Sequence, residues 1–130
     1  MYSVLISGGF PSSSRKKVEL YNLGTKTSCF PPDLPEERSG HTSVGGVICG
    51  GGSEDSTWNS CIDISSGSWS SDNYQSIRQK FGHESWDIGQ SFMLLGGGTW
   101  EGDARRTTDI VNKNDGTVVP ADFLLEYDVQ

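Results

Sequence analysis

Three short apolar runs that end in paired glycines recur along the chain. They read VLISGG at 4–9, GVICGG at 46–51 and FMLLGGG at 92–98. A strand with one wet face alternates apolar and polar residues, whereas a continuous apolar run is typical of a strand buried on both faces. The glycine pairs that end the runs are Gly8–Gly9, Gly50–Gly51 and Gly96–Gly97, so the steps are 42 and 46 residues. This spacing predicts a structural repeat.

Other markers follow the same period. Gly-His dipeptides stand at 40–41 and 82–83, and an arginine precedes each of them, Arg38 and Arg78. After each glycine pair the chain has a polar loop, a short alternating stretch, a turn and a further short strand. The alternating stretches are VELY (18–21), CIDI (61–64) and TDIV (108–111), and the further strands are KTSCF (26–30), GSWSS (67–71) and VVPADFLL (118–125).

A period of about 40–50 residues with four short strands per unit is typical of the blades of a β-propeller. The inner strands are SGHTSV at 39–44 and FGHESW at 81–86. The predicted fold is therefore all-β, with about three blades of four antiparallel strands. The predicted division of the chain is 1–30 for a first blade without its inner strand, 31–72 for the second blade, 73–125 for the third, and 126–130 for an inner strand of a following or partner blade.

The order Arg, Gly-His, apolar run, Gly-Gly and VELY resembles the kelch repeat, across the whole chain. VELYNLGTKTS at 18–28 is similar to that family's third strand and turn, and DLPEERSGH at 33–41 to its loop into the next blade. Trp69 matches the family's tryptophan after the turn, although Ser28 stands there in the first blade. The resemblance implies a non-enzymatic module that binds a protein, or alternatively a glycan, through loops on one face.

Three blades do not close a ring, because propellers have roughly 4–8 blades. Open blades would leave apolar faces and strand edges bare. We therefore expect a ring of about six blades, completed either by a second copy of the chain or by the remainder of a longer protein.

Charge and hydropathy exclude two classes of partner. The chain has 17 acidic and 10 basic residues and a net charge of −7. Nucleic-acid binding requires a basic surface, so a nucleic-acid partner is not expected. No apolar stretch approaches the roughly 18 residues that a membrane span requires, so a membrane partner is not expected either.

The chain has three cysteines, Cys29, Cys49 and Cys61. The second apolar run ends at Cys49 and the next strand begins at Cys61, so the two can face each other, and this is the favoured pair. Cys29 could instead link the first blade to the second, and all three could be reduced. The cysteine pattern resembles that of secreted invertebrate kelch-type proteins, which implies a disulfide and an extracellular location; the alternative is cytoplasmic.

The sequence gives no catalytic, metal-binding or cofactor-binding residues. His41 and His83 occupy equivalent repeat positions, so we interpret them as structural histidines of the inner strands. No zinc spacing, P-loop or catalytic serine motif occurs.

Function is expected in the loops that join the blades' strands, since binding residues concentrate on loops held by a rigid scaffold. Trp58, Trp100 and Arg105 are the candidate partner-binding residues, because exposed Trp and Arg dominate interface energies. In the alternative interpretation each tryptophan packs on its own blade. Two further hypotheses are a structural subunit of an extracellular assembly and a propeller enzyme, such as a carbohydrate-active or oxidase domain fragment.

Overall fold

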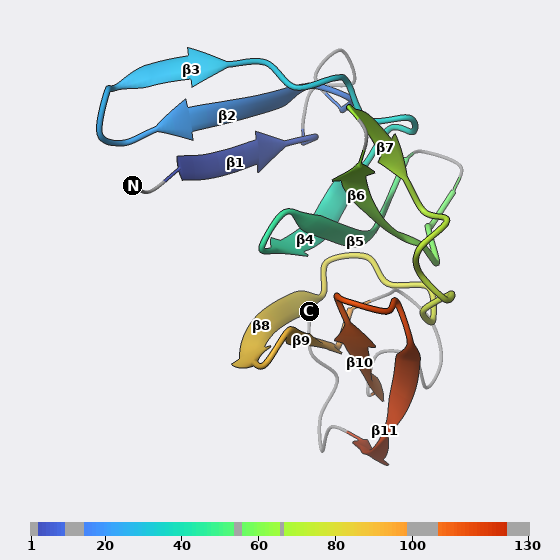
Figure 1. The fold of residues 1–130 in the computed structure, drawn as a ribbon. Helices are drawn as coiled ribbons and strands as arrows, with labels where there is room; N and C mark the ends of the chain where they lie inside the picture. The colour runs from blue at the N-terminus through green and yellow to red at the C-terminus, as the bar shows by residue number, and fades with distance from the viewer. Residues whose placement is uncertain (1–2, 10–14, 54–55, 66, 99–106, 125–130) are drawn as a thin grey trace.

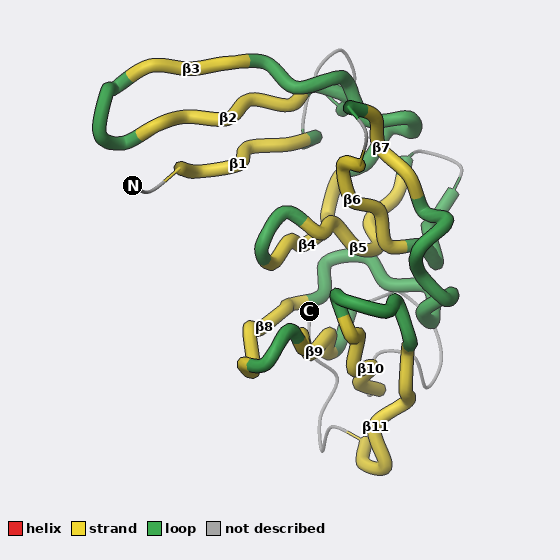
Figure 2. Tube along the Cα trace, in the orientation of Figure 1, coloured by secondary structure: helices red, strands yellow, loops and turns green. Residues whose placement is uncertain are grey.

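The chain forms three antiparallel β-sheets that follow one another from top to bottom of Figure 1. The computed structural model describes residues 3–9, 15–53, 56–65, 67–98 and 107–124. For residue 65 and residues 122–124 it describes the backbone alone. These residues contain strands, turns and loops but no helix (Figure 2). The predicted all-β class is therefore confirmed. No sheet is closed on itself, so the propeller and the kelch family remain hypotheses.

Each sheet is a simple up-and-down arrangement in which consecutive strands are neighbours. The first sheet contains β1 (Ser3–Ser7), β2 (Val18–Asn22) and β3 (Thr27–Cys29). The second contains β4 (Ser39–Val44), β5 (Val47–Gly52), β6 (Cys61–Ser65) and β7 (Ser68–Ser70). The third contains β8 (Glu84–Gly89), β9 (Phe92–Gly96), β10 (Thr107–Asn112) and β11 (Val118–Leu124).

The strands lie close to the predicted stretches, with one clear shift. The strand predicted over 81–86 begins three residues later, at Glu84, and continues to Gly89. Counted from the repeat histidine to the glycine that bonds to the next strand, the hairpin of β8 and β9 covers residues 83–97 and that of β4 and β5 covers 41–50, so the former is longer. Its turn contains two non-glycine residues with positive φ, Gln90 at 50° and Ser91 at 70°.

The first glycine of each pair has the same hydrogen bond in all three sheets. Its N–H donates to the carbonyl oxygen of the residue just before or at the start of the following strand. These bonds are Gly8 to Lys17 at 2.9 Å, Gly50 to Ser60 at 3.0 Å and Gly97 to Thr107 at 3.2 Å. The third pair is therefore Gly97–Gly98, one residue later than the predicted Gly96–Gly97. Gly96 is the last residue of β9 and lies opposite Thr108.

The second glycine of each pair shows where an inner strand is present. A Cβ atom added at Gly51 would lie 2.8 Å from the Cβ of His41, and one at Gly98 would lie 2.7 Å from the Cβ of His83. An added Cβ at Gly9 would meet nothing within 4 Å. This difference arises because the first sheet has no described strand in the inner position.

Two apolar clusters hold the sheets together. One lies between the first and second sheets and the other between the second and third. Their buried members are Val18, Leu34, Ile48 and Ile62 in the first cluster, and Val47, Cys49, Cys61, Ile77, Met93, Leu95 and Val111 in the second. Successive residues of β5 thus face opposite neighbours, and all six residues of this strand are buried. This burial on both faces explains the continuous apolar run.

Candidate functional site

The two repeat histidines lie where one sheet meets the next. A hydrogen bond of 2.8 Å joins the Ser7 hydroxyl to Nε2 of His41, and one of 2.7 Å joins the Thr42 hydroxyl to Nε2 of His83. Burial lowers the pKa of both imidazoles, and that of His83 falls to about 3, with Lys80 and His41 as further causes. These contacts fit the structural role expected for both residues. Among the described residues no group of three or more His, Cys, Asp or Glu side chains could hold a metal ion.

Stability should fall at acid pH because of these histidines. The pKa of His83 is lower in the folded chain than the usual 6.5. As the pH falls from about 6 to about 3, the His83 imidazole therefore binds a proton in the unfolded chain but not in the folded one. We expect His83 to lower the free energy of unfolding by about 1.4 kcal/mol per pH unit in this range. Urea denaturation at several pH values measures the slope. The His83→Gln variant should have a smaller slope than the wild type, and equal slopes would contradict this assignment.

A buried cation stands three residues before each of these histidines. Arg38 is fully buried, and its guanidinium donates to the Gly50 carbonyl at 2.8 Å and to the Ser60 hydroxyl at 2.6 Å. Lys80 is also fully buried, and its ammonium donates to the Thr107 carbonyl at 3.3 Å. The counterpart of Arg38 is therefore Lys80 and not the predicted Arg78.

Arg78 has a different partner. Its Nε donates to the buried Asp109 carboxylate at 2.9 Å, and its backbone N–H donates to the other oxygen at 3.1 Å. These bonds tie the segment between β7 and β8 to the middle of β10. All three cations thus tie loop segments to neighbouring strands.

Cys49 and Cys61 form a disulfide. The two residues lie directly opposite each other on β5 and β6, with 4.1 Å between their Cα atoms, and both are fully buried. This is the pairing that the strand arrangement favoured. Cys29 is free and exposed on β3, so it does not link the first sheet to the second.

Of the three candidate partner-binding residues, the structure describes Trp58. Its indole N–H donates to the Glu37 carbonyl at 3.0 Å, and the Arg38 guanidinium carbon lies 5.6 Å from the ring centroid. The polar edge of Trp58 is therefore hydrogen-bonded to the segment that leads into the second sheet, which fits the alternative interpretation. Trp100 and Arg105 lie outside the described residues.

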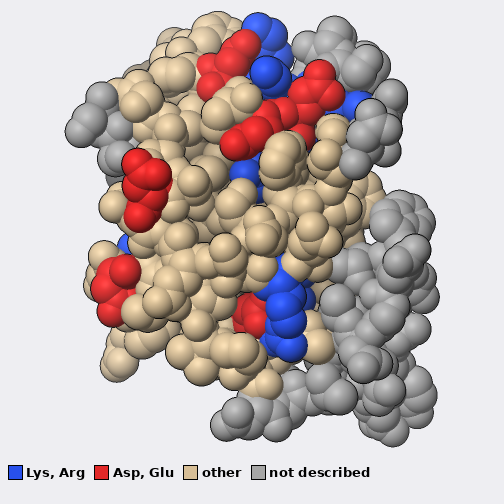
Figure 3. All heavy atoms as spheres, turned by 90° about the vertical axis from the view of Figure 1, so that its right-hand side faces the viewer, with Lys and Arg blue, Asp and Glu red and all other residues tan. Residues whose placement is uncertain are grey.

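Charged side chains of both signs lie next to each other on the face shown in Figure 3. The described ion pairs include Arg15 with Glu37 at 3.6 Å and Lys17 with Asp33 at 3.0 Å. The described part of this face thus has no large patch of charges of one sign.

The described residues contain no helix that is long and apolar enough to cross a membrane.

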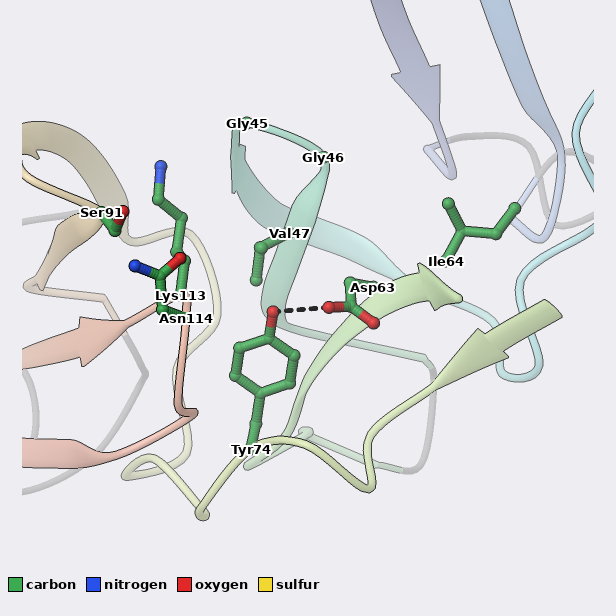
Figure 4. Close-up of a pocket in the computed structure, with 9 residues that line it drawn as sticks. All are labelled: Gly45, Gly46, Val47, Asp63, Ile64, Tyr74, Ser91, Lys113 and Asn114. Carbon is green, nitrogen blue, oxygen red and sulfur yellow. Dashed lines mark hydrogen bonds between the residues drawn. The ribbon is translucent and has the colours of Figure 1, made fainter. Parts of the chain in front are cut away.

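A cavity of about 370 Å³ lies between the second and third sheets (Figure 4). It lies at the end of the sheets that carries the β4–β5, β8–β9 and β10–β11 turns, and Tyr74 from the loop between the second and third sheets also lines it. The lining residues are Gly45, Gly46, Val47, Asp63, Ile64, Tyr74, Ser91, Lys113 and Asn114. Its volume is within the usual range of about 300–1,000 Å³ for small-molecule sites.

Asp63 and Tyr74 meet at the edge of this cavity (Figure 4). The Tyr74 hydroxyl donates to Oδ2 of Asp63 at 2.7 Å, whereas Oδ1 is buried and accepts no hydrogen bond from any described residue. Burial, together with the Asp63 hydrogen bond and charge, raises the pKa of Tyr74 above its usual value. The phenol is therefore a donor at all physiological pH values.

The segments that carry these residues are held from both sides. Gly116 accepts from the backbone N–H of Gln75 at 2.9 Å, and the Gln75 side chain accepts from Val118 N–H at 3.0 Å. Lys113 N–H donates to the Ser91 carbonyl at 2.8 Å, so the two turns of the third sheet are joined. The cavity walls are thus built from connected backbone.

The sequence interpretation missed this site, although one signal was present. Val18, Cys61 and Thr108 occupy equivalent positions, opposite Ser7, Cys49 and Gly96. Two residues further along each strand are Leu20, Asp63 and Ile110. A carboxyl group therefore replaces an apolar residue in the second sheet alone.

Comparison with known proteins does not identify a family, since no protein-family model and no curated protein matches the chain.

Proposed function

We propose that this chain is part of a kelch-like β-propeller and acts as a non-catalytic binding scaffold. In this proposal a second copy or the remainder of a longer chain supplies the missing blades, to about six in all. The observation that supports it is an apolar row on the outer face of the third sheet.

The row crosses all four strands of that sheet. Trp86 lies opposite Leu94, Leu94 opposite Ile110, and Ile110 opposite Val119. Directly paired residues of an antiparallel sheet project from the same face. The neighbours along β9, Met93 and Leu95, are fully buried toward the second sheet, so the row faces away from it. Trp86 is 46% exposed and Val119 57% exposed.

The second sheet shows what covers such a row. Its corresponding residues include Val44 and Val47, which are paired in the same way and pack against the third sheet. At the other end of the array, Ile6 on β1 is 53% exposed, whereas its counterpart Ile48 on β5 is fully buried against the first sheet. The exposed face of the first sheet thus resembles the face of the second sheet that packs on the first. The exposed face of the third sheet resembles the face of the second sheet that packs on the third.

Light scattering on the folded protein tests the self-assembled ring. We expect a particle of twice the 14.1 kDa chain mass, and dissociation when Trp86 and Val119 are both replaced by Glu, because charges would then be buried against the next sheet. The control is Leu23→Glu, at an apolar residue that is 52% exposed in the β2–β3 turn. A wild-type monomer would exclude the second copy and leave a longer chain as the source of the blades.

We further propose an extracellular location and a protein partner, with a glycan as the alternative. The disulfide fits an oxidising compartment, since disulfides are rare in the cytosol. Partner contact through the loops between blades is supported by the rigid scaffold beneath them. A pull-down with extracellular fluid and a Trp100→Ala and Arg105→Ala double variant tests the loop face. Equal capture by both proteins would contradict it.

A further inference from the structure

The cavity between the second and third sheets contains a carboxyl group without a matching cation. Asp63 forms no ion pair with any described residue, and its one described hydrogen bond comes from the neutral Tyr74 phenol. Asp63 is half-buried, and its Oδ1 is fully buried; a buried carboxylate oxygen without a donor is costly, because its desolvation is not compensated. An apolar residue would avoid this cost, as Leu20 and Ile110 do in the other two sheets. A residue that breaks the local pattern without compensation indicates a function.

The opposite wall carries the opposite charge. Lys113 belongs to the β10–β11 turn of the third sheet, and its ammonium lies near the β4–β5 turn, 3.2 Å from where a Cβ of Gly45 would stand. Figure 4 shows Lys113, Asn114 and Ser91 on one side of the cavity and Asp63 and Val47 on the other. The acid and the base thus approach from different sheets.

We infer that this cavity binds a small zwitterion, of the free amino-acid type, in addition to the scaffold role of the chain. The ligand's ammonium would meet the Asp63–Tyr74 pair and its carboxylate would meet Lys113. A simple cation would satisfy Asp63 but be repelled by Lys113, and a simple anion would be repelled by Asp63. A neutral sugar would leave both charges unmatched. Val47 provides an apolar wall for a small side chain.

The site needs little rearrangement before it binds. Tyr74 N–H donates to the Ser71 carbonyl at 3.0 Å, and the following residue is bonded to Gly116. A Cβ at Gly116 would overlap the Asn73 carbonyl, so the two segments are in close contact. Preorganised walls reduce the entropic cost of binding.

Chemical shifts of ¹⁵N-labelled protein during titration with L-alanine test the inference. We expect saturable shifts at the amides of Tyr74, Ser91 and Asn114, and weaker response to methylammonium, acetate or glucose. The decisive variant is Asp63→Leu, which restores the residue type of the other sheets and should fold at least as stably as the wild type. It should bind L-alanine about tenfold or more weakly, because a charged hydrogen bond is lost.

Two further variants separate a binding role from a structural one. Lys113→Gln should weaken L-alanine binding but not methylammonium binding, since it removes only the partner of the carboxylate. Asp72→Asn is the control, because Asp72 is an exposed carboxylate outside the cavity. The inference is overturned if L-alanine produces no saturable shift, if Asp63→Leu binds it as the wild type does, or if glucose alone saturates the site.

Discussion

Replacement of Gly50 by alanine should destabilise the protein by about 3 kcal/mol or more. Gly50 has a φ of 68°, a conformation that costs other residues about 1–2 kcal/mol. The added Cβ would also lie 2.6 Å from the Lys80 carbonyl oxygen and 2.7 Å from Cε1 of His83. Neither neighbour can move freely, because Lys80 accepts from Gly51 N–H at 2.7 Å and His83 is bonded to Thr42. The two effects therefore add.

Gly46 is the matched control. Its φ is 82°, but an added Cβ would meet nothing within 4 Å. Gly46→Ala should thus cost only the backbone strain of about 1 kcal/mol. Urea denaturation followed by tryptophan fluorescence gives both free energies. An equal loss of unfolding free energy in the two variants would contradict the close contact of Gly50 with Lys80 and His83.

These glycines also show how far the sequence could predict the fold. Spacing alone predicted the all-β class and the place of most strands, because each buried strand is a continuous apolar run and each turn has its glycine. The pair in the third sheet was misplaced by one residue, since FMLLGGG offers three consecutive glycines. Hydrogen bonding decides between them: Gly97 donates to Thr107, whereas Gly96 remains inside β9.

The choice of Arg78 as the counterpart of Arg38 has a similar cause. Residue type suggested a second arginine. The feature that recurs is instead a long cationic side chain that donates to the carbonyl beside the glycine pair or to the start of the next strand. Lys80 does this from the equivalent backbone position, and its carbonyl also accepts from Gly51 as that of Arg38 accepts from Gly9. Equivalence in a repeat is thus fixed by backbone contacts, and side-chain identity is a weaker guide.

The cavity was beyond what the repeat pattern could predict. It depends on the packing of two sheets, on the longer β8–β9 hairpin and on Tyr74, which lies in an irregular segment with no repeat marker. Asp63 was visible in the sequence as part of CIDI, yet its unusual place appears only when the strands are aligned through their pairing with β1, β5 and β9.

Removal of the disulfide should have an effect of similar size to that of Gly50→Ala. Cys49 and Cys61 close a loop with a sequence separation of 12, and the entropy of such a loop in the unfolded chain corresponds to about 3 kcal/mol. Both residues also belong to the cluster between the second and third sheets. The double variant Cys49→Ala and Cys61→Ala therefore loses a cross-link and buried apolar volume together.

The free cysteine supplies the control for this prediction. Cys29→Ala should leave the midpoint of thermal unfolding unchanged, because Cys29 is exposed on β3 and forms no disulfide. Reducing agent should lower the midpoint of the wild type toward that of the double variant and leave the double variant itself unaffected. If reductant changed neither protein, the two buried thiols would contribute through packing alone. A loss in the double variant that reductant fails to reproduce would thus contradict the cross-link as the source of stability.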